Sequence, residues 1–293
     1  MIERIVAIVL LMSGAVASAM GQSVTVKPML QSSTLTVLTY NTFLRTPTWF
    51  FRDNQDWRIQ HMPGRLSGYD VVVLQEAFSS DHRRRVLDAL KSDYPYQSKI
   101  LGFDQLFSLN GGVVVLSRWP IDREAEHIFS VCNWPDCWVK KGVVYVRLNV
   151  NQQVVHLFGL HLQAEDEFAP TRLKQLGEVE VFVQAQRIPP HEPVLIAGDF
   201  NVDYFANDTD GEFDALAGAL NTVFPEPQPA ASYDSATNSM LQEDAKQRLD
   251  YVLYCRDHRQ PNAVTSEVVH VREHDLDLSD HHAVVSEMRF TDR

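Results

Sequence analysis

The stretch Val194-Leu195-Ile196-Ala197-Gly198-Asp199-Phe200-Asn201 joins four apolar residues directly to a polar segment. A short, continuous apolar run of this kind is typical of a strand that is buried on both faces. Gly198 permits a sharp turn directly after such a strand. We therefore expect a buried strand over residues 194–197, with a carboxylate and an amide, Asp199 and Asn201, at its end.

Similar runs recur along the chain and predict further strands. They cover residues 35–39, 71–74, 113–116, 143–146, 154–158, 251–254 and 283–288. Helical patterns are predicted over 81–91, 171–186 and 210–220, the first after the capping residues Ser79 and Ser80. Strands and helices interleave without strict alternation, which favours an α/β fold with sheets of mixed direction. No internal repeat or linker divides the chain, so we expect one domain.

Polar side chains stand where these apolar runs begin or end. They are Asn41, Gln75-Glu76, His161, Gly198-Asp199-Phe200-Asn201, Asp250 and Ser279-Asp280-His281. A polar group left unpaired beside a buried run is costly. Six such points from distant parts of the chain therefore predict one converging site.

The residue types at these points fit metal-assisted phosphoryl chemistry. A hard cation such as Mg²⁺ prefers oxygen ligands, which Glu76 and Asn41 can offer. Two histidines can serve as acid and base, and Asp250 is a candidate to orient His281. Asn201 can donate to a phosphate oxygen without adding negative charge.

Each residue also has a structural alternative. Asn41 could cap a turn, Glu76 could be a surface residue, and His161 could be a buried core histidine. These alternatives stay open on the sequence alone. His282 should point away from His281 if the two residues enter a strand, so we interpret it as structural.

Taken in order, the motifs resemble those of the endonuclease/exonuclease/phosphatase superfamily. The matching segments are Thr39-Tyr40-Asn41, Leu74-Gln75-Glu76, Gly198-Asp199-Phe200-Asn201, Arg248-Leu249-Asp250-Tyr251 and Ser279-Asp280-His281. Residues 117–121, 141–145, 159–166 and 232–239 narrow the resemblance to the secreted bacterial sphingomyelinases. This resemblance implies a four-layered α/β sandwich with two central mixed β-sheets and a site in a cleft at one end.

The resemblance also implies an activity. It is a phospholipase C reaction that depends on Mg²⁺ or another divalent cation and hydrolyses sphingomyelin to ceramide and phosphocholine. The metal would be held by Glu76, with Asn41 and Asp280 close by.

Five residues would carry the chemistry by the same resemblance. His281 is the general base that activates water, and Asp250 orients it. Asp199 and Asn201 contact the phosphate and the metal-bound water, and His161 assists departure of the ceramide oxygen.

One feature departs from the family pattern. The sphingomyelinases have a longer insertion with exposed aromatic residues before the Ser-Asp-His motif. Here only 28 residues separate Asp250 from Ser279, the stretch 269–278 has no aromatic residue, and Ala283 stands where the family has proline. The aromatic residues Trp49, Phe50, Phe51 and Trp57 could contact the membrane instead, or they could pack in the core.

The net charge of the chain excludes some classes of binding partner. The 293 residues include 26 Lys+Arg and 38 Asp+Glu, a net charge of −12. This balance argues against a broad nucleic-acid surface and against attraction to anionic lipid. We expect a monomer that acts on sphingomyelin or a related phospholipid at a membrane surface and has no stable nucleic-acid partner.

Two alternatives to this function remain. One is a secreted nuclease or a phosphodiesterase for another phospholipid; the other is a non-catalytic binding protein on the same fold. A nuclease should have basic residues around its cleft. The only basic triplet is Arg83-Arg84-Arg85, and on a helix its three side chains would point in different directions.

The N-terminus predicts export. Residues 1–19 have the pattern of a signal peptide, which would leave residues 20–293 as a catalytic domain that is extracellular or periplasmic. In an oxidising compartment Cys132 and Cys137 are expected to form a disulfide rather than a metal pair. Cys255 is expected to be a buried free thiol.

Overall fold

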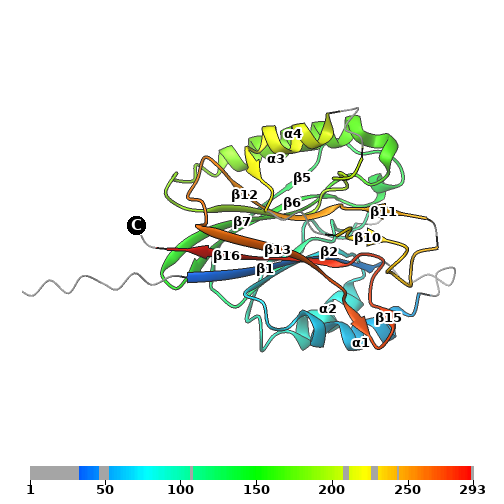
Figure 1. Cartoon of the computed structure of the whole chain (residues 1–293). Coiled ribbons are helices and arrows are strands. Elements are labelled where there is room, and N and C mark those ends of the chain that lie inside the picture. Colours follow the sequence, from blue (N-terminus) through cyan, green and yellow to red (C-terminus); the bar gives the residue numbers. More distant parts are fainter. Residues whose placement is uncertain are drawn as a thin grey trace, which may run out of the picture.

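Two six-stranded mixed sheets form the centre of the protein (Figure 1). The computed structural model describes residues 33–45, 53–105, 108–206, 211–225, 230–242 and 244–291. The predicted signal peptide and the aromatic residues Trp49, Phe50 and Phe51 lie outside these ranges.

The first sheet pairs the N-terminal strand with the last one. Its order is β13 (Ala263–Val269), β16 (Ala283–Phe290), β1 (Ser33–Leu44), β2 (Val71–Ala77), β4 (Val114–Ser117) and β3 (Tyr96–Gln97). Strands β1 and β2 are parallel, and the other neighbours are antiparallel.

The second sheet has the same mixture of directions. Its order is β5 (Ile121–Ile128), β6 (Gly142–Val150), β7 (Gln153–His161), β8 (Val194–Asp199), β12 (Asp250–Cys255) and β9 (Thr222–Val223). Only β7 and β8 are parallel among these six strands. The predicted strands are all confirmed, although most extend beyond the apolar run that predicted them.

Helices cover the outer face of each sheet, which gives four layers (Figure 1). α1 (Gln55–Leu66) and α2 (Ser80–Ala89) lie on the first sheet, and α3 (Ala169–Ala185) and α4 (Glu212–Ala219) lie on the second. Successive residues of β2 show why its apolar run is continuous. Val71 and Val73 face the core between the sheets, whereas Val72 and Leu74 face the core under the helices. The expected four-layered sandwich is confirmed.

Helix α1 was not predicted from the sequence. Its segment is polar on average and contains Pro63, and no side chain caps its first turn. The three predicted helices correspond to α2, α3 and α4, and Ser79 caps α2 as expected, with its side chain accepting from the backbone N–H of His82. Within the part of the chain that the structure describes, no helix has the length and apolar character needed to cross a bilayer.

Gly198 does not make a turn, so that prediction was wrong. Strand β8 continues through Asp199, and it is Asn201 that has a left-handed backbone, with φ of 51°. A Cβ atom at Gly198 would lie 2.1 Å from the carbonyl oxygen of Leu160 on the neighbouring strand. Glycine is needed here because β7 and β8 approach each other closely.

Four further short strands and two 3₁₀ turns complete the described structure. They are η1 (Asp136–Trp138), η2 (Asp166–Phe168), β10 (Tyr233–Asp234), β11 (Lys246–Gln247), β14 (Arg272–Glu273) and β15 (Leu276–Asp277). The last two pair as a small hairpin in the region where the resemblance implied a longer insertion.

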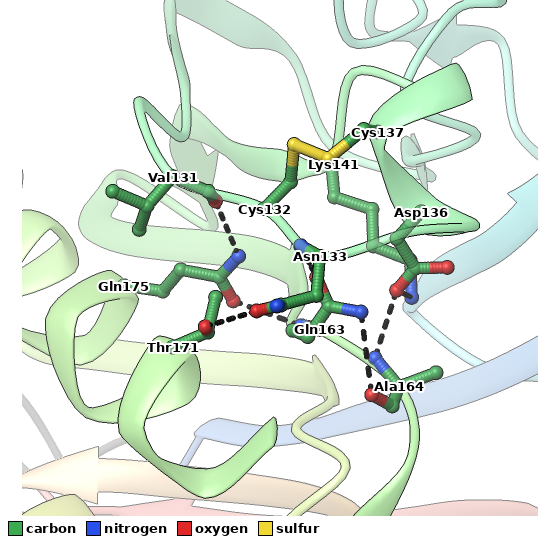
Figure 2. The surroundings of a disulfide bond; sticks show 10 residues. All are labelled: Val131, Cys132, Asn133, Asp136, Cys137, Lys141, Gln163, Ala164, Thr171 and Gln175. Atoms are coloured by element: carbon green, nitrogen blue, oxygen red, sulfur yellow. Dashed lines mark hydrogen bonds and ion pairs between the residues drawn. A yellow bond between two sulfur atoms is a disulfide. The ribbon is translucent and has the colours of Figure 1, made fainter. Parts of the chain in front are cut away.

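The predicted disulfide between Cys132 and Cys137 is present (Figure 2). Cys255 is buried with a free thiol, as expected. The disulfide closes a loop that is bonded to the segment after β7. The backbone N–H of Asn133 donates to Gln163 Oε1 at 2.7 Å, and the N–H of Ala164 donates to Asp136 Oδ2 at 2.8 Å. This loop therefore holds the chain directly after His161.

We expect replacement of both bridged cysteines by serine to lower the free energy of unfolding by about 2 kcal/mol, because the unfolded chain regains the entropy of the closed loop. Urea unfolding monitored by circular dichroism measures this loss. As a control, thiol titration of the unreduced, unfolded wild type should detect Cys255 alone. Detection of all three thiols would contradict the bridge.

Candidate active site

The predicted site residues of the second sheet lie side by side because of strand register. His161 at the end of β7 pairs with Asp199 on the parallel strand β8, and Asp199 pairs with Asp250 at the start of antiparallel β12. The end of one strand and the beginning of the next thus meet at one edge of the sheet. Three residues far apart in sequence become neighbours.

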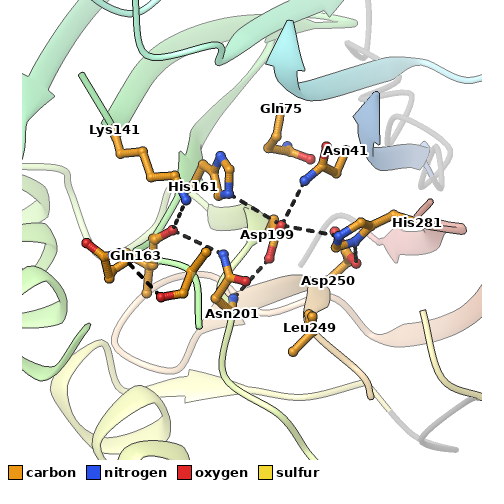
Figure 3. Close-up of polar contacts among 12 residues, drawn as sticks. Asn41, Gln75, Lys141, His161, Gln163, Asp199, Asn201, Leu249, Asp250 and His281 are labelled. Carbon is orange, nitrogen blue, oxygen red and sulfur yellow. Dashed lines mark hydrogen bonds and ion pairs between the residues drawn. The ribbon is translucent and has the colours of Figure 1, made fainter. Parts of the chain in front are cut away.

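The first sheet brings its own polar residues to the same place (Figure 3). Asn41 on β1 pairs in register with Gln75 on β2, and Glu76 follows. The side chain of Asn41 crosses between the sheets, where its Nδ2 donates to Asp199 Oδ2 at 3.0 Å. The convergence that the strand ends predicted is confirmed.

Asp199 is the centre of the cluster. Its Oδ2 lies 3.5 Å from His161 Nε2 and 3.8 Å from His281 Nε2, and its Oδ1 accepts from the backbone N–H of Asn201 at 3.0 Å. Burial, and then the charge of Asp250, raise the pKa of Asp199 to about 6. Asp199 thus stands between both predicted catalytic histidines.

His281 is paired with Asp250, as the sequence predicted. His281 Nδ1 lies 2.8 Å from Asp250 Oδ2, and both side chains are almost fully buried. Burial disfavours the imidazolium, but the carboxylates of Asp250, Asp199 and Asp280 outweigh it and raise the pKa of His281 to about 10. The hydrogen bond fixes the ring so that Nε2 faces Asp199.

The pKa of His161 is shifted in the opposite direction from that of His281. It is fully buried, and burial together with the nearby cations Lys141 and His281 holds its pKa well below the usual range. Its Nδ1 has no hydrogen-bond partner among the described residues. The cluster therefore combines a neutral histidine and a cationic one.

Two further carboxylates, Glu76 and Asp280, stand at the cleft. Burial, followed by the charge of Asp280, raises the pKa of Glu76 to about 7, and burial also raises the pKa of Asp280. Glu76 has a left-handed backbone, with φ of 50°, and its carboxylate makes no hydrogen bond or ion pair with the described residues. Closely spaced, incompletely paired carboxylates are the donors that a hard divalent cation binds, so these residues fit Mg²⁺.

Nitrogen and oxygen atoms of Asp199, Asp250 and His281 also lie within 4.8 Å of one another, which is compatible with a metal ion.

Asn41 differs from a simple metal ligand, because both polar atoms of its side chain already make hydrogen bonds. Its amide nitrogen faces Asp199, while its Oδ1 accepts from the backbone N–H of Phe43 at 3.1 Å.

Lys141 lies next to the site, and sequence reasoning assigned it no role. It is buried, its Nζ lies 2.6 Å from Asp136 Oδ2, and it donates to the carbonyl oxygen of Leu162 at 2.9 Å (Figure 3). The same carbonyl accepts from Asn201 Nδ2 at 3.1 Å. Lys141 and Asn201 thus share one acceptor, which links the disulfide loop to the site. The only indication of a role for Lys141 in the sequence was its place in the segment 141–145, which resembles the sphingomyelinases.

Arg58 was missed for a different reason, because helix α1 was missed. This buried guanidinium donates to the carbonyl oxygens of Thr42, Phe43 and Leu278 at 3.1, 2.7 and 3.0 Å. It therefore joins the end of β1 to the segment that carries Asp280 and His281.

The cluster opens into a cleft of about 490 Å³. Seven of the side chains that line it are carboxylates and one is a lysine: Glu76, Glu165, Asp166, Glu167, Asp199, Asp244, Asp280 and Lys246. His282 does not line it and instead stacks on His270, with ring centroids 4.0 Å apart. The cleft is therefore strongly acidic.

Sequence comparison identifies relatives of the chain. The model of the Endonuclease/Exonuclease/phosphatase family matches residues 38–281. Sphingomyelinase C from Bacillus cereus is 30% identical over 269 residues, which cover 82% of this chain and 80% of that protein.

Solved structures agree with the sequence comparison. The crystal structure of sphingomyelinase C from Streptomyces griseocarneus superposes with a TM-score of 0.77 and 32% identity, over 87% of this chain and 99% of that one. A mutant of beta toxin from Staphylococcus aureus, crystallised with bound magnesium ions, has a TM-score of 0.78 and 26% identity over 87% and 100% of the two chains. The chain therefore belongs to the endonuclease/exonuclease/phosphatase family and, within it, to the sphingomyelinase C family of phosphodiesterases.

Proposed function

We propose that the protein hydrolyses sphingomyelin to ceramide and phosphocholine in a reaction that depends on Mg²⁺. The observation that carries this proposal is the Asp250–His281 pair beside Asp199 in an acidic cleft. Membership of the sphingomyelinase C family supports the substrate. A non-catalytic binding protein would not need this arrangement of buried acids and histidines.

The metal would be held by Glu76 and Asp280, with Asn41 positioned by its bond to Asp199. When bound, Mg²⁺ would neutralise charge on the phosphoryl oxygens. Neutralisation of the nearby carboxylates would also lower the pKa of His281 toward neutrality, since those carboxylates are what raise it.

His281 would then act as the general base. Because Nδ1 is hydrogen-bonded to Asp250, Nε2 is the nitrogen free to take a proton from the attacking water. A bond forms between the water oxygen and phosphorus, and the bond from phosphorus to the ceramide oxygen breaks. The proton removed from the attacking water stays on His281 until solvent takes it, and the leaving oxygen takes up a proton from solvent water in the open cleft.

The other site residues would stabilise the transition state. His161 is neutral and can donate a hydrogen bond to the leaving oxygen. Asn201 can donate to a phosphoryl oxygen without adding negative charge, and Asp199 fixes the orientation of both histidines. Lys141 acts as a positioning residue for Asn201 through the shared carbonyl of Leu162.

The charge of the cleft favours a zwitterionic lipid over a polyanion. Seven carboxylates would repel a nucleic-acid strand but can accept a cationic choline group. The basic triplet does not offset this, because Arg84 and Arg85 pair with Asp81 and Asp56 and Arg83 donates to backbone carbonyls. Another choline phospholipid is the second candidate substrate.

An exposed aromatic pair offers the contact with the membrane. Trp134 and Trp138 on the disulfide loop are 64% and 59% exposed, with ring centroids 5.2 Å apart, and Phe103 is 62% exposed. Lys140, two residues after Trp138, contacts Phe103, with its Nζ 3.9 Å from the phenyl centroid. Tryptophan is favoured at the boundary between lipid and water.

The position of this loop fits such a contact. Asp136 within it is bonded to Ala164, which lines the cleft, so a bilayer that touches the rings would lie next to the site. By contrast Trp57, an alternative from the sequence, is half-buried against the core under the first sheet. We therefore assign the interfacial contact to Trp134 and Trp138.

Export is part of the proposal, with residues 20–293 as one catalytic domain. The disulfide between Cys132 and Cys137 supports it, because such bonds persist in oxidising compartments. The apolar core shared by the two sheets supports treatment of the region as a single domain.

We expect purified protein with Mg²⁺ to release phosphocholine from sphingomyelin and to lose this activity with EDTA. A panel with phosphatidylcholine, lysophospholipids and DNA ranks the substrates by kcat/KM. Faster turnover of DNA than of any choline lipid would refute the proposed substrate.

We expect His281→Gln to lower kcat by about 10²- to 10⁴-fold, because the general base is removed while the amide can still donate to Asp250. His274→Gln, at an exposed position on the β14–β15 hairpin, is the matched control. Circular dichroism verifies that both variants are folded. A folded His281→Gln variant with wild-type kcat would show that another group is the base.

We expect the double substitution Trp134→Ser and Trp138→Ser to weaken binding to phosphatidylcholine vesicles by about tenfold or more, since two large apolar rings are lost. Cosedimentation measures binding, and Val181→Ser on the exposed face of α3 is the control. Turnover of a soluble short-chain substrate should stay unchanged. Equal vesicle binding by all three proteins would assign the membrane contact elsewhere.

A further inference from the structure

We propose that His270, Asp277 and His282 form a second metal site, which takes a transition ion of the Zn²⁺ type. His270 follows β13, Asp277 ends β15 and His282 precedes β16. One ligand atom from each lies within 4.8 Å of the other two. None of the three lines the catalytic cleft, so this site is separate from the one proposed for Mg²⁺.

His282 presents a buried nitrogen lone pair toward this site. Its Nε2 lies 3.0 Å from the hydroxyl of Thr237, which itself lies 3.4 Å from the carbonyl oxygen of Asp234. In the tautomer whose ring hydrogen is on Nε2 and is donated to this hydroxyl, Nδ1 is an acceptor, and this is the tautomer that would bind a metal ion. His282 is only 1% exposed, and Nδ1 has no hydrogen-bond partner among the described residues. A buried acceptor without a partner is costly, and a metal ion would satisfy it.

Asp277 is held in place by bonds of the kind that orient metal ligands. Its Oδ2 accepts from the backbone N–H and hydroxyl of Ser239 at 2.7 and 2.9 Å. Its Oδ1 lies 3.9 Å from His282 Nδ1 and accepts from Arg272 Nε at 2.6 Å. A carboxylate oxygen has a second lone pair, so Oδ1 can accept from Arg272 and still offer a lone pair to an ion.

His270 completes the site from the solvent side. It is exposed, and its ring lies against that of His282, so it can both admit an ion and adjust to it. Two imidazoles and one carboxylate favour Zn²⁺ or a similar transition ion over Mg²⁺ or Ca²⁺, which prefer oxygen ligands alone. A fourth position would remain open to water.

A metal ion here would join the segments that hold residues 279–282, the stretch that carries His281. The N–H of His282 donates to the carbonyl oxygen of Ser232 at 2.7 Å, and Asn238 Nδ2 donates to the carbonyl oxygens of Ser279 and Asp280 at 3.0 and 2.9 Å. Loop 230–242, the β14–β15 hairpin and the entry to β16 would thus be cross-linked. We therefore expect bound Zn²⁺ to raise the melting temperature.

The experiment uses full-length protein stripped of metal with EDTA, returned to saturating Mg²⁺, and titrated with Zn²⁺ by calorimetry. His270→Asn is compared with His274→Asn, which removes a fully solvated histidine of the neighbouring hairpin. We expect His270→Asn to lose one equivalent of Zn²⁺ or to bind it at least tenfold more weakly, and to lose the Zn²⁺-induced rise in melting temperature. His274→Asn should match the wild type.

Substitution with Co²⁺ gives a second readout, since visible d–d absorption of a four-coordinate site should be present in the wild type and absent in His270→Asn. Zn²⁺ that binds in the catalytic cleft would be common to all three proteins and would cancel in the comparison. Equal Zn²⁺ stoichiometry and affinity in the wild type and His270→Asn would overturn the proposal. No substrate is used, so this result is independent of whether sphingomyelin is hydrolysed.

Discussion

The buried carboxylate of Asp199 is the point on which the site depends. It lies where the two sheets meet, and a buried carboxylate is tolerated only when hydrogen bonds and charges compensate it. Asn41 reaches it from the first sheet, the N–H of Asn201 from its own strand, and the rings of His161 and His281 flank it. The same contacts that stabilise the charge also position His161, Asn201 and His281.

Two buried cations, Lys141 and Arg58, bind the backbone segments next to this acidic centre. Lys141 pairs with Asp136 in the disulfide loop, and Arg58 on α1 donates to the carbonyl oxygens of Thr42 and Leu278. Each fixes the carbonyl groups of a segment that carries site residues, so the scaffold is electrostatic as well as apolar. The net charge of −12 is consequently not spread evenly, because carboxylates gather in the cleft, whereas Lys141 and Arg58 are buried and do not line it.

Adjacent histidines serve different environments because a β-strand entrance turns successive side chains to opposite sides. His281 faces the cleft and bonds to Asp250, whereas His282 faces away and meets His270 and Asp277. The segment 279–282 is therefore held between two polar clusters. Both clusters thus contact the same short segment of backbone.

The sequence by itself determined the eight inner strands of the two sheets, three of the four helices that the structure describes, the disulfide and the polar residues that converge, because apolar runs and their polar ends are local signals. It did not predict the edge strands β5 and β13, because these lack a continuous apolar run. It did not reveal helix α1, whose segment is polar and contains Pro63, or the roles of Arg58 and Lys141. Those cations matter through backbone carbonyls distant in sequence. Only the tertiary structure decided them, since strand register and the approach of the two sheets set which charges become neighbours.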